Sequence, residues 1–477
     1  MASFQVKDAY AVMNALARQA TGQADISVVD HTSFIDAGTK TLATGTENVL
    51  NSIARTIKEV VIQSRPYKGK FGLIAATEDK FNTRKAKISF YAADNVASGA
   101  FNTDANTNIV DGGNAETSGV GSQWEMNLPK VVERFFLSEA AWDKFYTTPL
   151  VQLQSAFNDE ATFIRFWNGV ITEVENDIES TLESRNRAVV ADRAAGIYLQ
   201  ANATTPTLGE ECSVNLVDYF NEKCGTTYSM EEILTKHLTE FLELWVAKIK
   251  IDSDRLEERS ALYHDPLTIA ASGGKPAYNV LRHTPKAQQK MFYFAELFTE
   301  AHARVLPEIF NPQYLDVKNG EAVTYWQSNK PGQRASIAAK PALPDGATSS
   351  DVELGFVVGL LFDDEAMQTC NQFTGAYATP VHARKLVQNT FYHYKFGAIQ
   401  DYTENSILYY MEDKFEEFKG DGTEDDFVLT GDVNSILKVV VAGQEVSADD
   451  YTYDADTQTV TFDTAPANKA VIKIYYK

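Results

Sequence analysis

The sequence predicts a mixed α+β fold in which helices and strands do not alternate in the βαβ order of a parallel sheet. The first observation is a run of apolar residues at spacings of three and four between residues 157 and 199. The second is a set of strand-like segments scattered among helical ones after residue 84. The third is a change of composition at residues 419–426, after which short alternating segments follow. We therefore expect a large mixed body and a small all-β module at residues 426–477.

The apolar run predicts a long amphipathic helix, because residues three and four apart share one helical face. Asn158 is a plausible N-cap, Gly196 is a plausible end, and no proline between Pro149 and Pro206 breaks the run. Such a helix would be roughly 60 Å long at about 1.5 Å per residue. The apolar stripe thins after Leu182, so the second half is either a separate helix or a surface for another subunit.

Two faces of this helix follow from the same spacing. The predicted buried face consists of Phe163, Ile164, Trp167, Val170, Ile171, Val174 and Ile178. The charged residues, among them Glu183, Arg185 and Arg187, fall mostly on the rest of the helix surface.

The first sixty-odd residues indicate an arm with two short helices and no core of its own. Residues 6–19 have helical spacing, whereas residues 20–42 are polar and broken and indicate an extended segment. Thr46 then begins a second amphipathic helix that Pro66 ends. Because helices of this length are marginal alone, we expect the arm to lie on other structure.

Residues 84–137 predict a flap built from two strands. The strands are expected at residues 87–91 and 123–137, and the segment between them, residues 93–122, contains no lysine, arginine or proline. A structureless connection of about thirty residues is uncommon inside a domain. It is either a disordered surface loop or the tip of a long flap that a neighbouring subunit orders. The residues expected at that interface are Tyr91, Phe101, Trp124 and Met126.

The body after Ser229 mixes both kinds of element. Residues 354–362 are apolar at every position but two glycines, which predicts a strand that is buried on both faces. The expected helices cover residues 230–250 and 287–306, and the other expected strands cover residues 323–327, 389–399 and 406–411. His237 lies on the apolar face of the first helix, where a satisfied core histidine is more common than a metal ligand.

Charge and cysteine content narrow the functional classes. The chain has 43 Lys and Arg against 65 Asp and Glu, a formal charge of −22. This charge argues against a protein that binds nucleic acid through its phosphates. Three cysteines cannot all pair within one chain, so they fit a reducing compartment or chance burial. The N-terminus lacks the pattern of a secretory signal, and no run of about 18 apolar residues predicts a membrane span.

Sequence motifs of catalysis are absent. There is no Gly-rich phosphate loop, dinucleotide fingerprint, zinc-protease motif, Cys-x-x-Cys pair or nucleophile elbow. Asp363, Asp364 and Glu365 form three adjacent carboxylates, for which a solvated loop or a helix N-terminus is a commoner explanation than a metal. We therefore predict no catalytic, cofactor-binding or metal-binding residue.

Several segments of the sequence resemble segments of one protein family. They are DAGTKTLATGTENVLNSIARTI at residues 36–57, RHTPKAQQKMF at 282–292, the VTYWQ strand at 323–327, VVGLLFDDEAM at 357–367 and DYTENSILYYMED at 401–413. Together with the order of arm, flap, long helix, mixed lobe and returning strands, they resemble the major capsid proteins of tailed bacteriophages, with the Hong Kong 97-type shell fold. The resemblance covers residues 30–415 and is strongest toward shell proteins of gut phages.

The resemblance implies a division into domains. It assigns an N-terminal arm to residues 1–66, an extended flap (E-loop) to 67–138, a peripheral domain with the spine helix to 139–228 and 386–418, and an axial domain to 229–385. The module at residues 426–477 resembles small immunoglobulin-like additions of phage structural proteins. Some shell proteins crosslink a flap lysine to a neighbour's asparagine, and Lys85 and Lys87 lie in the expected flap.

The resemblance also implies a function. It indicates a structural subunit, not an enzyme, that self-assembles as hexamers and pentamers into the icosahedral shell of a virion, in the host cytoplasm. Such a shell encloses double-stranded DNA without sequence-specific binding and needs no cofactor or membrane. Its further partners would be decoration proteins, a portal and a scaffold. Two other classes stay open: a cytosolic enzyme with an unfamiliar site, and a phage tail or adhesin protein, for which the β module is the clue.

Overall fold

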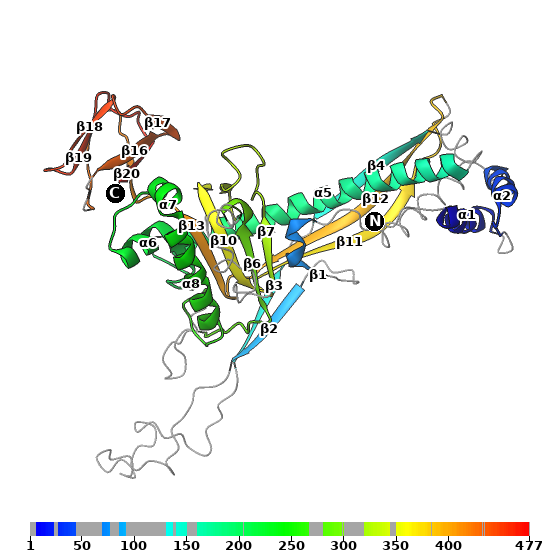
Figure 1. Cartoon of the computed structure of the whole chain (residues 1–477), viewed down its shortest axis with the longest axis horizontal. Coiled ribbons are helices and arrows are strands. Elements are labelled where there is room, and N and C mark those ends of the chain that lie inside the picture. Colours follow the sequence, from blue (N-terminus) through cyan, green and yellow to red (C-terminus); the bar gives the residue numbers. More distant parts are fainter. Residues whose placement is uncertain are drawn as a thin grey trace, which may run out of the picture. The chain divides into compact units, whose positions relative to one another are not determined.

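Figure 1 draws a computed structural model of the whole chain. The chain divides into two units. One unit comprises Met1–Glu78 and Ala141–Lys477, and the other comprises Asp79–Ala140. The structure describes residues 6–22, 27–43, 69–76, 85–91, 130–136, 140–149, 160–203, 205–266, 280–297, 299, 319–343, 350–382, 384–431, 433 and 435–476. The helix expected from Thr46 and the segment at residues 93–122 therefore lie outside the described residues.

The small unit contains a ribbon of two antiparallel strands. These are β2 (Lys85–Tyr91) and β3 (Lys130–Phe136), with Lys85 opposite Phe136 and Tyr91 opposite Lys130. The predicted pairing is confirmed for these residues. An isolated two-stranded ribbon is at best marginally stable in water, so this unit needs a further surface to pack on.

Two helices begin the described chain, where the sequence predicted one. These are α1 (Val6–Thr21), as expected, and α2 (His31–Ala43), in the segment that was expected to be extended. The extended prediction was wrong because the apolar face of α2 is made of few, mostly small residues. Asp30 caps this helix by accepting from the backbone N–H of Ser33 at 2.8 Å. The buried residues of the two helices are Met13, Leu16, Ala17, Phe34, Ala37 and Thr41.

The long helix α5 (Glu160–Ala201) is continuous over 42 residues. Val174 and Ile178 of its predicted buried face are confirmed as buried, whereas the side chains of Phe163, Ile164, Trp167, Val170 and Ile171 lie outside what the structure describes. The helix passes through Gly196, so the predicted end there was wrong. Its second half packs within the chain through the buried residues Val189, Val190, Ala191, Ala194, Ala195 and Ile197.

A four-stranded sheet runs beside α5 (Figure 1). Its order is β1 (Ala75–Ala76), β11 (Met367–Ala378), β12 (Val387–Gln400) and β4 (Ala140–Pro149). Only β12 was predicted. Burial alternates along it, and its buried row contains Tyr392, Tyr394 and Phe396. Alternation in a strand places these three rings on one face of the sheet, and Arg185 of α5 lies over the Phe396 ring.

A five-stranded sheet forms the centre of the body. Its order is β5 (Ser213–Asn215), β13 (Ser406–Met411), β10 (Phe356–Asp363), β6 (Gln289–Phe294) and β7 (Asn319–Val323). The buried strand expected at residues 354–362 corresponds to β10, and the strand expected at 406–411 is β13. Seven of the eight residues of β10 are buried, as expected for a strand covered on both faces.

Two predictions in this sheet were wrong. The helix expected at residues 287–306 begins as β6, because QKMFYF lies between β10 and β7 and is held by both neighbours. The strand expected at residues 323–327 is displaced, since β7 ends at Val323. Trp326 follows it as a buried anchor whose Nε1 donates to Val357 O at 2.9 Å.

Helices α6 (Leu216–Cys224), α7 (Met230–Lys236) and α8 (Leu238–Leu256) complete this part of the body. Ser229 caps α7 through a capping box with Glu232, but the single helix predicted at residues 230–250 breaks at His237. The ring of His237 is half-buried and stacks on Tyr228 at 4.4 Å, and its Nδ1 lies 3.0 Å from Glu240 Oε2. His237 is therefore satisfied, although it is not a core residue.

Three short elements remain. The 3₁₀ helix η1 (Lys70–Ile74) places Phe71 and Ile74 in the main core, although both fall in the range predicted for the flap. Strands β8 (Ile337–Ala339) and β9 (Val352–Leu354) pair with each other.

The C-terminal module is a sandwich of two small sheets. One has the order β14 (Phe415–Lys419), β20 (Val471–Tyr476), β16 (Ile436–Val441) and β17 (Gln444–Val446). The other has the order β15 (Asp426–Val428), β19 (Thr459–Phe462) and β18 (Tyr451–Asp454). The two sheets enclose their own core, which includes Phe427, Val439, Val460, Phe462, Ile472 and Ile474.

The predicted character of this module is confirmed, but its predicted start at residue 426 was too late. Strand β14 precedes the polar segment at residues 419–426 and pairs along its length with β20. Strands β16 and β17 form a hairpin whose turn has positive φ at Ala442 (51°) and Gly443 (81°), as a tight two-residue turn requires.

Candidate interaction surfaces

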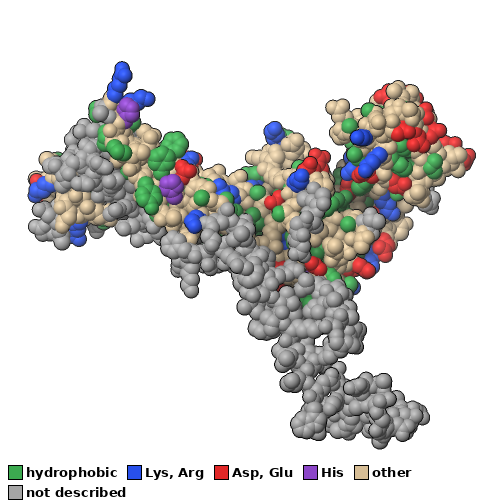
Figure 2. All heavy atoms as spheres, turned by 180° about the vertical axis from the view of Figure 1, so that it is seen from behind, with side chains coloured by type: hydrophobic (Ala, Val, Ile, Leu, Met, Phe, Trp, Pro, Cys, Tyr) green, Lys and Arg blue, Asp and Glu red, His purple; other side chains and the backbone are tan. Residues whose placement is uncertain are grey.

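A row of aromatic rings crosses the open face of the sheet that contains β4, β11 and β12. The ring centroids of neighbouring members are close together. The distance is 5.8 Å between Phe145 on β4 and Phe391 on β12, 6.4 Å between Phe391 and His393, and 5.6 Å between His393 and Tyr377 on β11. Phe145 is 58% exposed and Tyr377 is 64% exposed. We call these four residues the aromatic row. Figure 2 shows hydrophobic and histidine side chains gathered over this end of the sheet.

The hairpin between β11 and β12 ends in a small basic surface. His382, Arg384 and Lys385 are exposed there, and Leu386 is 45% exposed with a positive φ of 51°. The turn is held by its own bonds, since Leu386 N and Lys385 N both donate to His382 O. On a chain with a formal charge of −22, this end presents positive charge to any partner of the sheet face.

The second half of α5 holds buried cations that sequence reasoning placed mostly on the surface. The guanidinium of Arg187 lies 2.5 Å from Glu183 Oε1, donates to Tyr325 O and stacks over the Tyr325 ring at 3.6 Å. It also lies over Phe71 of η1 at 4.8 Å. Glu183 and Arg187 are four residues apart, so they pair on one face of the helix. Through Arg187, this pair connects α5 to Phe71 of η1 and to Tyr325.

Arg193 is the most buried cation described, at 1% exposure. It donates from Nη2 to Ser406 Oγ at 2.8 Å and lies over the Tyr402 ring at 4.2 Å. Burial is the largest influence on this guanidinium and lowers its pKa. The spacing signal could have found it, because Arg193 lies three residues after Val190 and three before Gly196 on the buried side of the helix.

The three adjacent residues Asp363, Asp364 and Glu365 each contact other groups of the protein. Asp363 accepts from Thr284 Oγ1 at 2.7 Å, and Asp364 forms an ion pair with Lys290. Glu365 lies in the turn after β10, and its N–H donates to Asp363 Oδ1 at 2.8 Å. Within the part of the chain that the structure describes, no group of three His, Cys, Asp or Glu residues is placed to hold a metal ion.

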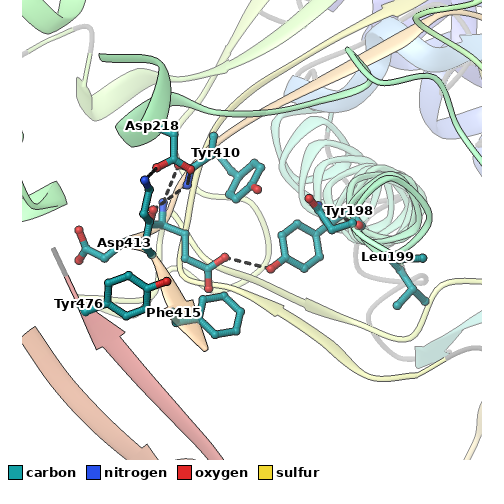
Figure 3. A pocket seen from close by; sticks show the side chains of 12 residues that line it. Tyr198, Leu199, Asp218, Tyr410, Asp413, Phe415 and Tyr476 are labelled. Carbon is teal, nitrogen blue, oxygen red and sulfur yellow. Dashed lines mark hydrogen bonds and ion pairs between the residues drawn. The ribbon is translucent and has the colours of Figure 1, made fainter. Parts of the chain in front are cut away.

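A cleft of about 600 Å³ lies where the body meets the C-terminal module (Figure 3). Its lining includes Tyr198, Tyr410, Glu412, Phe415 and Tyr476. Tyr198 reaches from α5 and donates to Glu412 Oε2 at 3.0 Å. Burial raises the pKa of Glu412, which the Tyr198 bond and the charges of Lys473 and Lys438 oppose. These side chains join the body to the C-terminal module.

Of the flap interface residues that the sequence proposed, Tyr91 closes β2 opposite Lys130. Phe101, Trp124 and Met126 lie outside the described residues. The predicted interface of these four residues therefore stays a prediction, and the aromatic row was found only once the strands were paired. No helix in the described ranges is both long enough and apolar enough to cross a membrane.

Comparison with known proteins gives a fold-level likeness. No family model matches the sequence, and no curated protein matches it. Among solved structures, the chain is similar to the capsid structure of Staphylococcus phage Andhra, with 12% identity and a TM-score of 0.44 over 71% of this chain and 83% of that one. It is also similar to the capsid of cyanophage P-SCSP1u, with 11% identity and a TM-score of 0.38 over 72% and 87%. The mature capsid of bacteriophage PhiM1 gives 9% identity and a TM-score of 0.36 over 72% and 87%.

Proposed function

We propose that this chain is a structural subunit that self-assembles into the virion shell of a tailed bacteriophage and encloses double-stranded DNA. The observation that carries the proposal is the aromatic row, whose two end rings are 58% and 64% exposed. A contiguous row of exposed aromatic rings on one sheet face is typical of a surface that another protein covers. A self-assembling chain supplies that protein as further copies of itself.

The two-stranded ribbon supports the same proposal. Strands β2 and β3 pair with each other, and a ribbon of this kind gains stability by packing on another surface. Residues 93–122 between them contain no cation and few large apolar residues, so ordering their backbone at about 1–2 kcal/mol per residue requires contacts from elsewhere. Neighbouring subunits would provide those contacts.

The resemblance stated from the sequence then assigns roles to the elements. In this proposal α5 is the spine helix, the unit Asp79–Ala140 is the extended flap (E-loop), and α1 with α2 belongs to the N-terminal arm. Strands β4 and β12 fall in the peripheral domain, whereas β11 and most of the five-stranded sheet fall in the axial domain. Hexamers and pentamers, a portal, a scaffold and decoration proteins are the partners of such a shell, and it carries out no catalysis.

Electron microscopy of the purified full chain, with a double variant, tests the proposal. Phe145→Ser with Tyr377→Ser removes two exposed rings, so we expect the chain to fold with an unchanged circular dichroism spectrum and to lose its closed particles. Val428→Ser is the matched control, because Val428 is also 58% exposed but lies on β15 of the C-terminal module. We expect the control to assemble as the wild type does.

Three outcomes would count against the shell. Discrete monomers of the wild type under every condition, including co-expression with the other head proteins of its phage, would favour an enzyme of an unfamiliar kind. A low copy number of the chain in purified virions, measured by mass spectrometry, would favour a tail or adhesin protein. Particles from the double variant indistinguishable from the wild type would remove the aromatic row as the observation that carries the proposal.

A further inference from the structure

Four buried polar side chains form a chain of hydrogen bonds at the junction of the two large sheets. His264, Asn405, Thr284 and Asp363 are each at most 5% exposed. His264 Nδ1 lies 3.0 Å from Asn405 Oδ1, and Asn405 Nδ2 donates to Thr284 Oγ1 at 3.1 Å. The Thr284 hydroxyl in turn donates to Asp363 Oδ2 at 2.7 Å. Asn405 lies in the turn between β12 and β13, where one sheet continues into the other.

The other ring nitrogen of His264 also faces an acceptor. Nε2 lies 2.9 Å from the backbone oxygen of Val280. A carbonyl oxygen accepts and never donates, so Nε2 must carry a hydrogen to form this bond. The backbone at Val280 is itself fixed, because its N–H donates to Pro266 O at 2.7 Å.

The bonds of Thr284 determine which way the Asn405 amide points. A hydroxyl has one proton, and when Thr284 gives it to Asp363 its oxygen can only accept from Asn405. The Asn405 NH₂ group must then face Thr284, which turns Oδ1 toward His264. Both ring nitrogens consequently face acceptors, and only a doubly protonated imidazolium donates to both of them.

When His264 is neutral, the same side chains can form a different pattern of hydrogen bonds. With its one proton on Nε2 for Val280, Nδ1 becomes an acceptor. Asn405 satisfies it by rotating its amide half a turn, so that Nδ2 donates to Nδ1 and Oδ1 faces Thr284. Thr284 then gives its proton to Asn405 instead of Asp363. The His264–Asn405 and Asn405–Thr284 bonds reverse their direction and the Thr284–Asp363 bond is lost, while the backbone stays in place.

We propose that His264, Asn405 and Thr284 form a two-state relay, in which protonation of His264 sets the direction of the hydrogen bonds at the sheet junction and decides whether Thr284 binds Asp363. The inference goes beyond the shell function and does not depend on assembly. It makes the turn between β12 and β13 sensitive to pH, because the carboxylate at the end of β10 gains or loses this donor with the proton on His264.

Burial sets the direction of this sensitivity, and several charged groups also lie around His264. Arg282 is the nearby cation and is paired with Glu404 at 3.2 Å, Asp265 is adjacent in the chain, and Arg193 approaches from α5 through Ser406. Burial is the largest influence and lowers the pKa of His264, whereas its bonds to Val280 and Asn405 raise it. With the folded pKa below the unfolded value of about 6.5, the neutral form prevails at neutral pH, and this residue's contribution to stability is lost as the pH falls.

Nitrogen NMR of the histidine rings tests the relay directly. The full chain is labelled with ¹⁵N-histidine, and the ring signals are followed between about pH 5 and pH 8. His264 is assigned by the loss of its signal in His264→Gln or, if that variant does not fold, by elimination with single variants of the other six histidines. The midpoint of the His264 signal is compared with the value of a free histidine, about 6.5.

The expected result is a neutral ring with its proton on Nε2 at high pH and an imidazolium at low pH, with a midpoint below the free-histidine value of about 6.5. Asn405→Asp replaces the amide with a group that only accepts, so we expect Nδ1 to keep its proton to higher pH and the midpoint to rise. A neutral ring with its proton on Nδ1 at high pH would overturn the relay. A midpoint unchanged in Asn405→Asp would also overturn it, and if that variant does not fold, the wild-type tautomer alone decides.

Discussion

The two ends of the layer formed by α5 and its sheet differ in what their side chains contact. Near the turn of residues 401–406, Val190, Arg193 and Ala194 of α5 are at most 1% exposed. At the other end, the aromatic row leaves Phe145 and Tyr377 more than half exposed. The same layer therefore stabilises the folded chain at one end and offers a surface at the other. The difference predicts that substitutions at the first end change stability and substitutions at the second change assembly.

The largest expected effect is at the buried end. Val190→Asp places a carboxylate without a partner in the core between α5 and the central sheet, where an ionised group costs far more than a hydrogen bond returns. We expect no folded protein, judged by circular dichroism and by insolubility on expression. Ser184→Asp, on the exposed side of the same helix, should fold normally. A folded Val190→Asp variant would show that this end of α5 is less tightly packed than its burial indicates.

A smaller effect is expected where α5 touches the turn at Tyr402. A Cβ atom added to Gly196 would lie 1.9 Å from the Tyr402 hydroxyl, so this residue has to be glycine for the turn to approach the helix. Alanine is better than glycine in a helix by about 1 kcal/mol, and yet we expect Gly196→Ala to lower the free energy of unfolding by about 1–3 kcal/mol through overpacking. Chemical denaturation measures the change.

The double variant Gly196→Ala with Tyr402→Phe separates the contact from other causes. Removing the hydroxyl removes the closest atom but leaves the ring carbon Cζ 2.9 Å from the added Cβ, so the double variant should recover part of the lost stability. If the stability losses of Gly196→Ala and Tyr402→Phe simply add, the close approach of Tyr402 to Gly196 does not cause the loss in Gly196→Ala. The tight packing inferred for this end of α5 would then be weakened.

Sequence periodicity predicted α5 but not its end, for a reason that the same glycine makes clear. The apolar spacing is local, so it fixed the helix and the burial of Val174 and Ile178. A glycine late in such a pattern is typical of a helix end, and here it instead accommodates Tyr402, which lies far along the chain. Long-range contact of this kind leaves no trace in local spacing.

The aromatic row was hidden from sequence reasoning in another way. Its rings come from three strands, of which β4 and β11 were not predicted, and each ring alone is as consistent with a core as with a surface. Strand β6 was mistaken for a helix because QKMFYF has no clear alternation, and its neighbours β10 and β7 decide its form. The C-terminal module, by contrast, was predictable because its strands are short, alternating and joined by local turns.

A modest effect of pH is expected at the cleft below the C-terminal module. Because burial raises the pKa of Glu412, its contribution to stability is present at low pH and is lost as the pH rises through the raised value. Glu412→Gln should therefore raise the melting temperature near neutral pH and have no effect near pH 4, since Tyr198 can still donate to the amide oxygen. Melting curves at both pH values check this. A variant that is less stable at neutral pH would mean that the charges of Lys438 and Lys473 outweigh burial.

The smallest change in stability is expected at the exposed end, and it makes the comparison quantitative. Phe145→Ser removes a ring that is 58% exposed, so the free energy of unfolding should change by less than about 0.5 kcal/mol. Phe396 is the matched residue, a phenylalanine of the same sheet that is 8% exposed on the buried row of β12. Phe396→Ser leaves a cavity and buries a hydroxyl, which should cost about 3–5 kcal/mol. Chemical denaturation of both variants as unassembled chains measures how much free energy of unfolding each one loses. Equal losses would show that the aromatic row is part of the subunit's own core and not a surface for a partner.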